Sequence, residues 1–334
     1  MQRLQFVLFQ MDEAKRYLAS GPLPSLRVAL MLLDNAAEVI LDRWIEDDLA
    51  HDDFSERIRS RAREVGIPET HPQFVDVYQR HFLTGKEKKK ISRFFDEKIR
   101  YLTETKPTVP LQTGSVLSHL HRYRNDAHHS ARVRQETVRT FGMIFLELCC
   151  QLIESLGQVS AGYSSSEDFS WLVSRFELKP IDLCHEGAIP TVLAEFRNDL
   201  PIGENSIRET LGTNLESRLE DLSEGLEYIS TETHVAIDRA AALAESQRFT
   251  LAETKKSAPY RRTPPKLNEP VSLSQLDWIE SIPGCIRNSS DALAGFRIYA
   301  EADAELERIE FMVQGFVGAI DAAIQMAVDR ARGK

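Results

Sequence analysis

The sequence predicts an all-α protein. Apolar residues recur every three to four positions in nearly every ordered-looking segment, which is the helical period. Glycine and proline are scarce, at 16 and 14 of 334 residues, and Leu, Ala, Glu and Arg dominate the composition. Strand-like alternation is nearly absent. We therefore expect a helical bundle over residues 1–157, followed by a second helical domain over residues 158–334.

The first strong helix is expected over residues 23–49, where apolar residues follow the helical spacing behind a Pro24-Ser25 start signal. A basic stretch then opens a further helix, expected over residues 86–104. The residues on its buried side are predicted to be Ile91, Phe94, Phe95 and Ile99.

A proline-containing break at residues 106–114 precedes the longest apolar pattern of the first half. Residues 115 to about 156 read as one long helix or as two helices end to end. Gly157 and the serine-rich stretch after it then mark a loop, and we expect the domain boundary there.

The second half is dominated by two long helical patterns, at about residues 205–247 and 299–331. The first has heptad-like spacing, and a proline-rich, basic linker over residues 250–270 separates the two. Helices of similar length joined by a linker would pair as an antiparallel hairpin. This hairpin is the predicted core of the second domain.

Charge is divided unequally between the halves. Residues 1–157 hold 23 Lys and Arg against 22 Asp and Glu, whereas residues 158–334 hold 18 against 29, within a net charge of −10. The first half is therefore the part able to meet a polyanion.

Cysteine spacing and the apolar segments narrow the class of protein further. The four cysteines, which form no metal-ligand spacing and read as reduced thiols, are Cys149, Cys150, Cys184 and Cys285. The N-terminus does not have the pattern of a secretion signal. The most apolar long stretch, residues 311–328, is interrupted by Gln314, Asp321 and Gln325, so we expect no membrane span and a cytoplasmic protein.

One short stretch, "HRYRNDAHHSARVR" at residues 121–134, gathers four arginines and three histidines around a single aspartate. On a helix from about Ser115, Arg124 falls on the apolar stripe, so it must face a carboxylate, a subunit interface or a bound anion. The plainer alternatives are a solvated helix face, or a new helix start capped by Asn125 and Asp126. Guanidinium groups beside imidazoles favour phosphate binding with proton transfer.

"RNDAHH", residues 124–129, resembles the Arg-x4-His signature of HEPN domains, including the Asn that often follows the Arg. The helical setting of residues 1–157 is similar as well, with an early amphipathic helix and the motif near the start of a late apolar helix. The resemblance implies a dimeric, metal-independent endoribonuclease without a cofactor, of a kind often found in toxin–antitoxin or antiviral defence systems.

Carried over to this chain, the resemblance implies that Arg124 and His129 are the catalytic pair, with Asn125 as a supporting polar group. His128 is the rival proton carrier, because helical spacing places it nearer Arg124. RNA supplies its own 2′-hydroxyl nucleophile, so the protein needs proton carriers and a cation. The tyrosine that some members carry two positions after the His is replaced here by Ala131.

Other residues are assigned supporting roles. Binding of the RNA backbone is expected from Arg122, Arg132, Arg134, Lys88, Lys89 and Lys90, although a lysine run at a helix start is more often solvated surface. Asp34 and Glu38, four apart on the early helix, are expected to pair with Arg124 and orient it, or else to lie on a surface face.

The expected partners are therefore RNA, a second copy of the chain, and an antitoxin or regulatory protein, with no membrane and no metal. The alternative is a catalytically inactive scaffold that binds RNA or protein.

Overall fold

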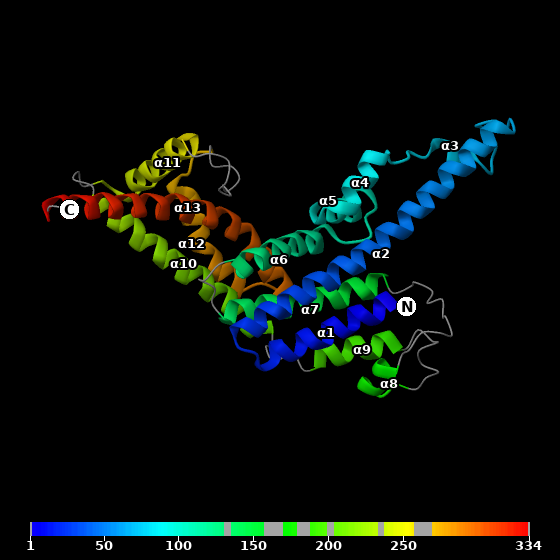
Figure 1. Cartoon of the computed structure of the whole chain (residues 1–334), viewed down its shortest axis with the longest axis horizontal. Helices are drawn as coiled ribbons and strands as arrows, with labels where there is room; N and C mark the ends of the chain where they lie inside the picture. The colour runs from blue at the N-terminus through cyan, green and yellow to red at the C-terminus, as the bar shows by residue number, and fades with distance from the viewer. Residues whose placement is uncertain are drawn as a thin grey trace. The chain divides into compact units, whose positions relative to one another are not determined.

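The computed structural model describes most of the chain as helix. The described residues are 2–129, 135–156, 170–178, 188–198, 204–232, 237–256 and 269–332. They form α-helices and one π-helix, and no strand occurs among them, which confirms the predicted all-α class (Figure 1). The chain divides into two compact units, Met1–Pro201 and Ile202–Lys334, each described here by itself.

The first unit is organised around one long helix, α2. Its elements are α1 (Gln2–Ser20), α2 (Leu23–Glu64), α3 (Val75–Gln79), α4 (Gly85–Arg93), α5 (Phe95–Arg100), the π-helix η1 (Tyr101–Thr105), α6 (Leu111–His129), α7 (Gln135–Leu156), α8 (Ser170–Arg175) and α9 (Ala188–Asn198). Helices α1 and α7 pack along the N-terminal part of α2, and α4, α5 and α6 contact α2 as well (Figure 1).

Helix α2 begins at the predicted Pro24-Ser25 signal but continues fifteen residues past the predicted end at residue 49. Its first half buries a leucine stripe, whereas beyond Ile45 it buries Asp52, Ser55 and the small Ala62 instead of large apolar residues. The Asp52 carboxylate is satisfied by Lys88 Nζ at 3.1 Å. The helix ends at Glu64, and Gly66 just beyond it has a φ of +74°, which suits the left-handed turn that closes the helix.

The predicted helix over residues 86–104 is three elements. Helix α4 starts at a capping box between Thr84 and Glu87. It stops at Phe94, which is extended (φ −113°, ψ 128°), and α5 and η1 follow. Ile91, Phe95 and Ile99 are buried as predicted, but Phe94 is 49% exposed because the break turns it outward.

The long pattern over residues 115–156 is two helices, α6 and α7, and residues 130–134 between them lie outside the described part. The first unit also extends past the boundary predicted at residue 157. Helix α9 packs on α1 and α7, and its Arg197 binds Glu147 and Glu154 of α7. Because Phe196 is fully buried there, α9 belongs to the first core.

The second unit contains α10 (Glu204–Glu232), α11 (Arg239–Lys256), α12 (Leu273–Arg287) and α13 (Ala292–Ala331). The helix predicted over residues 205–247 is therefore α10 and the start of α11. Of the predicted linker, residues 257–268 lie outside the described part, and residues 250–256 belong to α11.

The antiparallel pairing predicted for the second unit is wrong: α10 and α13 run parallel. Contacts between them advance in the same direction along both helices, from Arg218 with Asp303 to Tyr228 with Asp321. Helix α12 runs antiparallel to α10, since Arg287 at the end of α12 binds Glu209 and Glu216 near the start of α10 (Figure 1). The chain therefore returns along α12 before α13 begins. The short α12 thus takes the antiparallel place that the sequence pattern gave to α13.

One helix among the described residues, α13, is long and apolar enough to cross a membrane, judged by length and composition only. Within its most apolar 18-residue window, 11% is buried. Asp321, in this segment, accepts a hydrogen bond from the Tyr228 hydroxyl at 2.6 Å.

Candidate functional site

The centre of the candidate site is a buried carboxylate, Asp34, on the face of α2 that meets α6. Asp34 is 1% exposed. One of its oxygens binds His121 Nδ1 at 2.7 Å, and the other accepts a hydrogen bond from Arg124 Nη2. Two donors on one helix therefore share a single acid on another, and this offsets the cost of burying the charge.

Arg124 lies on the apolar stripe of α6, as the sequence predicts, between the buried residues Leu120 and Ala127. Of the three partners considered from the sequence, the structure shows the carboxylate, Asp34. Asn125, expected to support the site, accepts a hydrogen bond from Arg124 Nη1 at 2.8 Å. The guanidinium is thus fixed from two sides.

The same guanidinium is only partly used. Of its five N–H groups, one donates to Asp34 and one to Asn125. Its Nε is buried without a hydrogen-bond partner among the described residues, and the side chain as a whole is 25% exposed. Arg124 is therefore oriented while N–H groups on its terminal nitrogens are left for an anion.

His121 is the residue that sequence reasoning missed, because it was counted in the basic stretch but given no role. Its ring stacks on Phe95 of α5, with centroids 4.1 Å apart and planes 3° apart. The side chain is 20% exposed. The signal that could have found it is spacing: His121 and Arg124 are three apart, so a helix places both on one face.

Glu38, the second acid expected to orient Arg124, pairs with another cation. It lies 3.5 Å from Lys98 Nζ, which also binds Asp42 at 2.6 Å. Lys98 is 3% exposed and belongs to α5. Asp34 therefore contacts α6, whereas Glu38, one turn further along α2, contacts α5. Glu38 binds Lys98 of α5 and does not orient the Arg124 guanidinium.

The residues expected to bind the RNA backbone are divided by the structure. Lys88 binds Asp52 and Asp53, and its pKa is raised mainly by the hydrogen bond to Asp53. Lys90 binds Glu97 at 2.5 Å. Lys89 and Arg122 are exposed. Two of the three lysines are therefore neutralised by neighbouring acids, which is the solvated-surface alternative.

The remaining sequence-predicted residues are not tested by the described part of the chain. Arg132 and Arg134 lie outside it. His128 and His129 lie in the last turn of α6, but their side chains are outside the description. The assignment of the proton carrier between these two histidines therefore stays a prediction.

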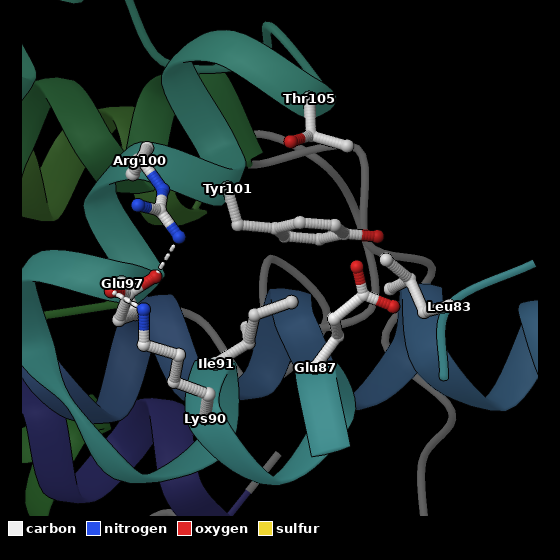
Figure 2. Close-up of a pocket in the computed structure, with 8 residues that line it drawn as sticks. All are labelled: Leu83, Glu87, Lys90, Ile91, Glu97, Arg100, Tyr101 and Thr105. Atoms are coloured by element: carbon white, nitrogen blue, oxygen red, sulfur yellow. Dashed lines mark hydrogen bonds and ion pairs between the residues drawn. The ribbon is translucent and has the colours of Figure 1, made fainter. Parts of the chain in front are cut away.

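A small pocket of about 100 Å³ lies between α4, α5 and η1 (Figure 2). At its rim Glu97 binds both Lys90 and Arg100. The Tyr101 hydroxyl donates to Asp48, and burial together with this bond raises the Tyr101 pKa. The pocket's ionic groups thus satisfy one another, so it is less suited to an anion than the Asp34 cluster.

Potential metal-ligand side chains and buried thiols are two further features of the described part of the chain. No group of three or more His, Cys, Asp or Glu side chains there could hold a metal ion. Burial raises the pKa of Cys149 far above its ordinary value, and that of Cys150 to about 12. These two thiols are core groups and not nucleophiles.

Comparisons of the chain with family models, curated proteins and solved structures return no match. The resemblance to HEPN domains therefore depends on residues 124–129 and their helical setting.

Proposed function

We propose that this protein is a metal-independent endoribonuclease of HEPN type. The observation that supports the proposal most is the state of Arg124, which a buried carboxylate orients without using all of its donors. An arginine held in this way is preorganised for a phosphate group. Asn125, which binds the same guanidinium, supports the arrangement.

The proposed reaction is transesterification by the 2′-hydroxyl of RNA. The 2′-oxygen forms a bond to phosphorus, the bond from phosphorus to the 5′-oxygen breaks, and the products are a 2′,3′-cyclic phosphate and a 5′-hydroxyl. Arg124 binds the scissile phosphate and stabilises the charge of the phosphorane. His129 transfers protons, with His128 as the rival carrier, and a second copy of the chain supplies the second histidine.

The proposed setting follows from the same resemblance. The protein acts in the cytoplasm as a homodimer on RNA, as a toxin or an antiviral defence effector, under an antitoxin or regulatory protein. Exposed Arg122, two residues before Arg124 on α6, is available to contact the RNA backbone, and so is Lys89. Arg132 and Arg134 are proposed to extend this contact.

A second candidate is a catalytically inactive scaffold that binds RNA or protein, and the pairing of the lysine run with acids favours its protein-binding form. Because Lys88 and Lys90 are bound by Asp52, Asp53 and Glu97, this surface offers less free positive charge than the sequence suggests. The scaffold binds without cleaving.

The test is incubation of the purified protein with labelled RNA in excess EDTA. The parent should cleave and leave 2′,3′-cyclic phosphate ends, and RNA with 2′-deoxyribose at the cleaved position should be inert. Arg124→Ala should lower the rate by about 10²–10³-fold, as expected for loss of a group that stabilises developing charge. His129→Ala and His128→Ala then separate the two proton carriers.

The matched control is Arg61→Ala, which removes an exposed arginine of α2 paired with Glu64, and should leave cleavage unchanged. Cleavage of the deoxy substrate, or full activity in Arg124→Ala, would contradict the nuclease proposal. Binding lost in Arg124→Ala without cleavage by the parent would select the scaffold.

A further inference from the structure

The shared carboxylate places an imidazole and a guanidinium side by side. His121 Nδ1 and Arg124 Nη2 bind the two oxygens of the same Asp34 side chain. The oxygens of one carboxylate are separated by less than the width of a phosphate group. Both side chains also reach the surface, at 20% and 25% exposure. One phosphodiester bound to Arg124 is therefore within reach of the His121 ring.

The contact with Asp34 also selects the state of the imidazole. A carboxylate only accepts hydrogen bonds, so the 2.7 Å contact requires the proton to be on Nδ1. In the neutral ring this leaves Nε2 with an unshared pair, and Nε2 makes no hydrogen bond to any described residue. The stack on Phe95 fixes the plane of the ring. These are the properties of an imidazole prepared to accept a proton.

We infer that His121 is a further proton-transferring residue of this site; the inference rests on the proposed nuclease function. Nε2 of His121 takes the proton of the 2′-hydroxyl as its oxygen bonds to phosphorus and the bond to the 5′-oxygen breaks. The departing 5′-oxygen receives its proton from the histidine of the Arg-x4-His motif, so His121 replaces the second copy's histidine as the proton acceptor. Asp34 stabilises the imidazolium that forms, while Arg124 holds the phosphate.

The charged groups around the His121 ring come from three helices, α2, α5 and α6. Asp34 on α2 and Arg124 on α6 are the charged groups that bind next to it. From α5, Phe95 presents an uncharged ring, and Lys98 of the same helix is paired with Glu38 and Asp42.

The test uses the full chain with His121→Asn, whose side-chain amide can still donate to Asp34 but cannot exchange a proton. This variant should fold and bind 2′-deoxy RNA as the parent does, while kcat falls by about 10²-fold or more, with little change in KM. The limb of the pH–rate profile that reports deprotonation of the base should disappear. His51→Asn, at an exposed histidine of α2, is the matched control and should leave both readouts unchanged.

Nitrogen NMR of the histidine rings adds a readout without activity. In its neutral form, His121 should be the Nδ1–H tautomer in the parent, and an Nε2–H tautomer would overturn the inference whatever the activity. Parental rates and pH profile in His121→Asn would also overturn it and leave the nuclease proposal standing. If the parent cleaves no RNA, the nuclease proposal falls and the inference falls with it.

Discussion

Arg124 in the first unit and Arg218 in the second are both half-buried arginines on long helices, with 25% and 20% of their side chains exposed. Arg218 gives Nε and Nη2 to Glu310, at 2.9 and 2.7 Å, and Nη1 to Asp303 and the Tyr299 hydroxyl. Arg124 has one carboxylate, one amide and an Nε without a partner among the described residues. The two guanidinium groups are similarly exposed to solvent, but they differ in how many of their nitrogens have a hydrogen-bond partner.

The comparison separates a structural arginine from one prepared for a ligand. Arg197 and Arg287 resemble Arg218, because each binds two glutamates and thereby joins two helices. A guanidinium with every nitrogen engaged holds helices together and has no donor left for another anion. Arg124 holds α6 to α2 and retains donors, which is why burial alone would not distinguish the two kinds.

The largest effect on stability is expected from Arg218→Ala. The substitution leaves Asp303 and Glu310 without their shared cation, and breaking a buried ion pair on one side costs about 3–5 kcal/mol of unfolding free energy. Urea denaturation of the full chain measures it. Arg248→Ala, at an exposed pair with Glu245, is the control and should change little. A loss of unfolding free energy below about 1 kcal/mol would show that an arginine with every nitrogen hydrogen-bonded need not be important for stability.

Arg124→Ala should cost less, about 1–2 kcal/mol, because Asp34 keeps the hydrogen bond from His121. The same denaturation experiment measures it beside the cleavage assay. The comparison predicts opposite patterns: Arg124→Ala affects catalysis more than stability, and Arg218→Ala the reverse. Equal stability losses in the two variants would remove the distinction.

The smallest effect is a pH dependence at α9. Hydrogen bonding to Arg197 holds the Glu154 pKa below its ordinary value of 4.5. The ion pair therefore stabilises α9 fully above about pH 4.5, and this contribution is lost as the pH falls through the lowered folded-state pKa. Hydrogen exchange of the α9 amides should speed up over that range beyond the intrinsic change with pH. In Arg197→Ala this pH dependence should vanish; its persistence would assign it to another group.

Helices could be predicted from the sequence wherever their buried side chains are apolar. The start of α2 follows from Pro24 and the leucine stripe, but its second half buries Asp52 and Ser55, which give no apolar period to read. The break at Phe94 was hidden for the opposite reason, since an exposed aromatic residue continues the helical pattern in sequence. Helices α10 and α13 run parallel because α12 reverses the chain before α13, and α12 has no heptad pattern from which it could be predicted.

The candidate site was predictable where the rule was local. Arg124 stood out because an arginine on an apolar stripe needs a partner, and Asp34 was among the acids considered. Choosing Asp34 over Glu38 required the position of α5, which is set by contacts far apart in sequence. Helical spacing also places His121, three residues before Arg124, on the same face of α6, but this spacing was used only for His128.

The bridge from Asp34 to Arg124 spans 90 residues of chain. During synthesis the acid on α2 leaves the ribosome well before the arginine on α6, so the guanidinium cannot be oriented until the chain has been made through α6. A nascent chain that ends before α6 carries the acid and neither of its two partners, His121 and Arg124. If the protein cuts RNA as proposed, its site can therefore form only after the ribosome has synthesised α6.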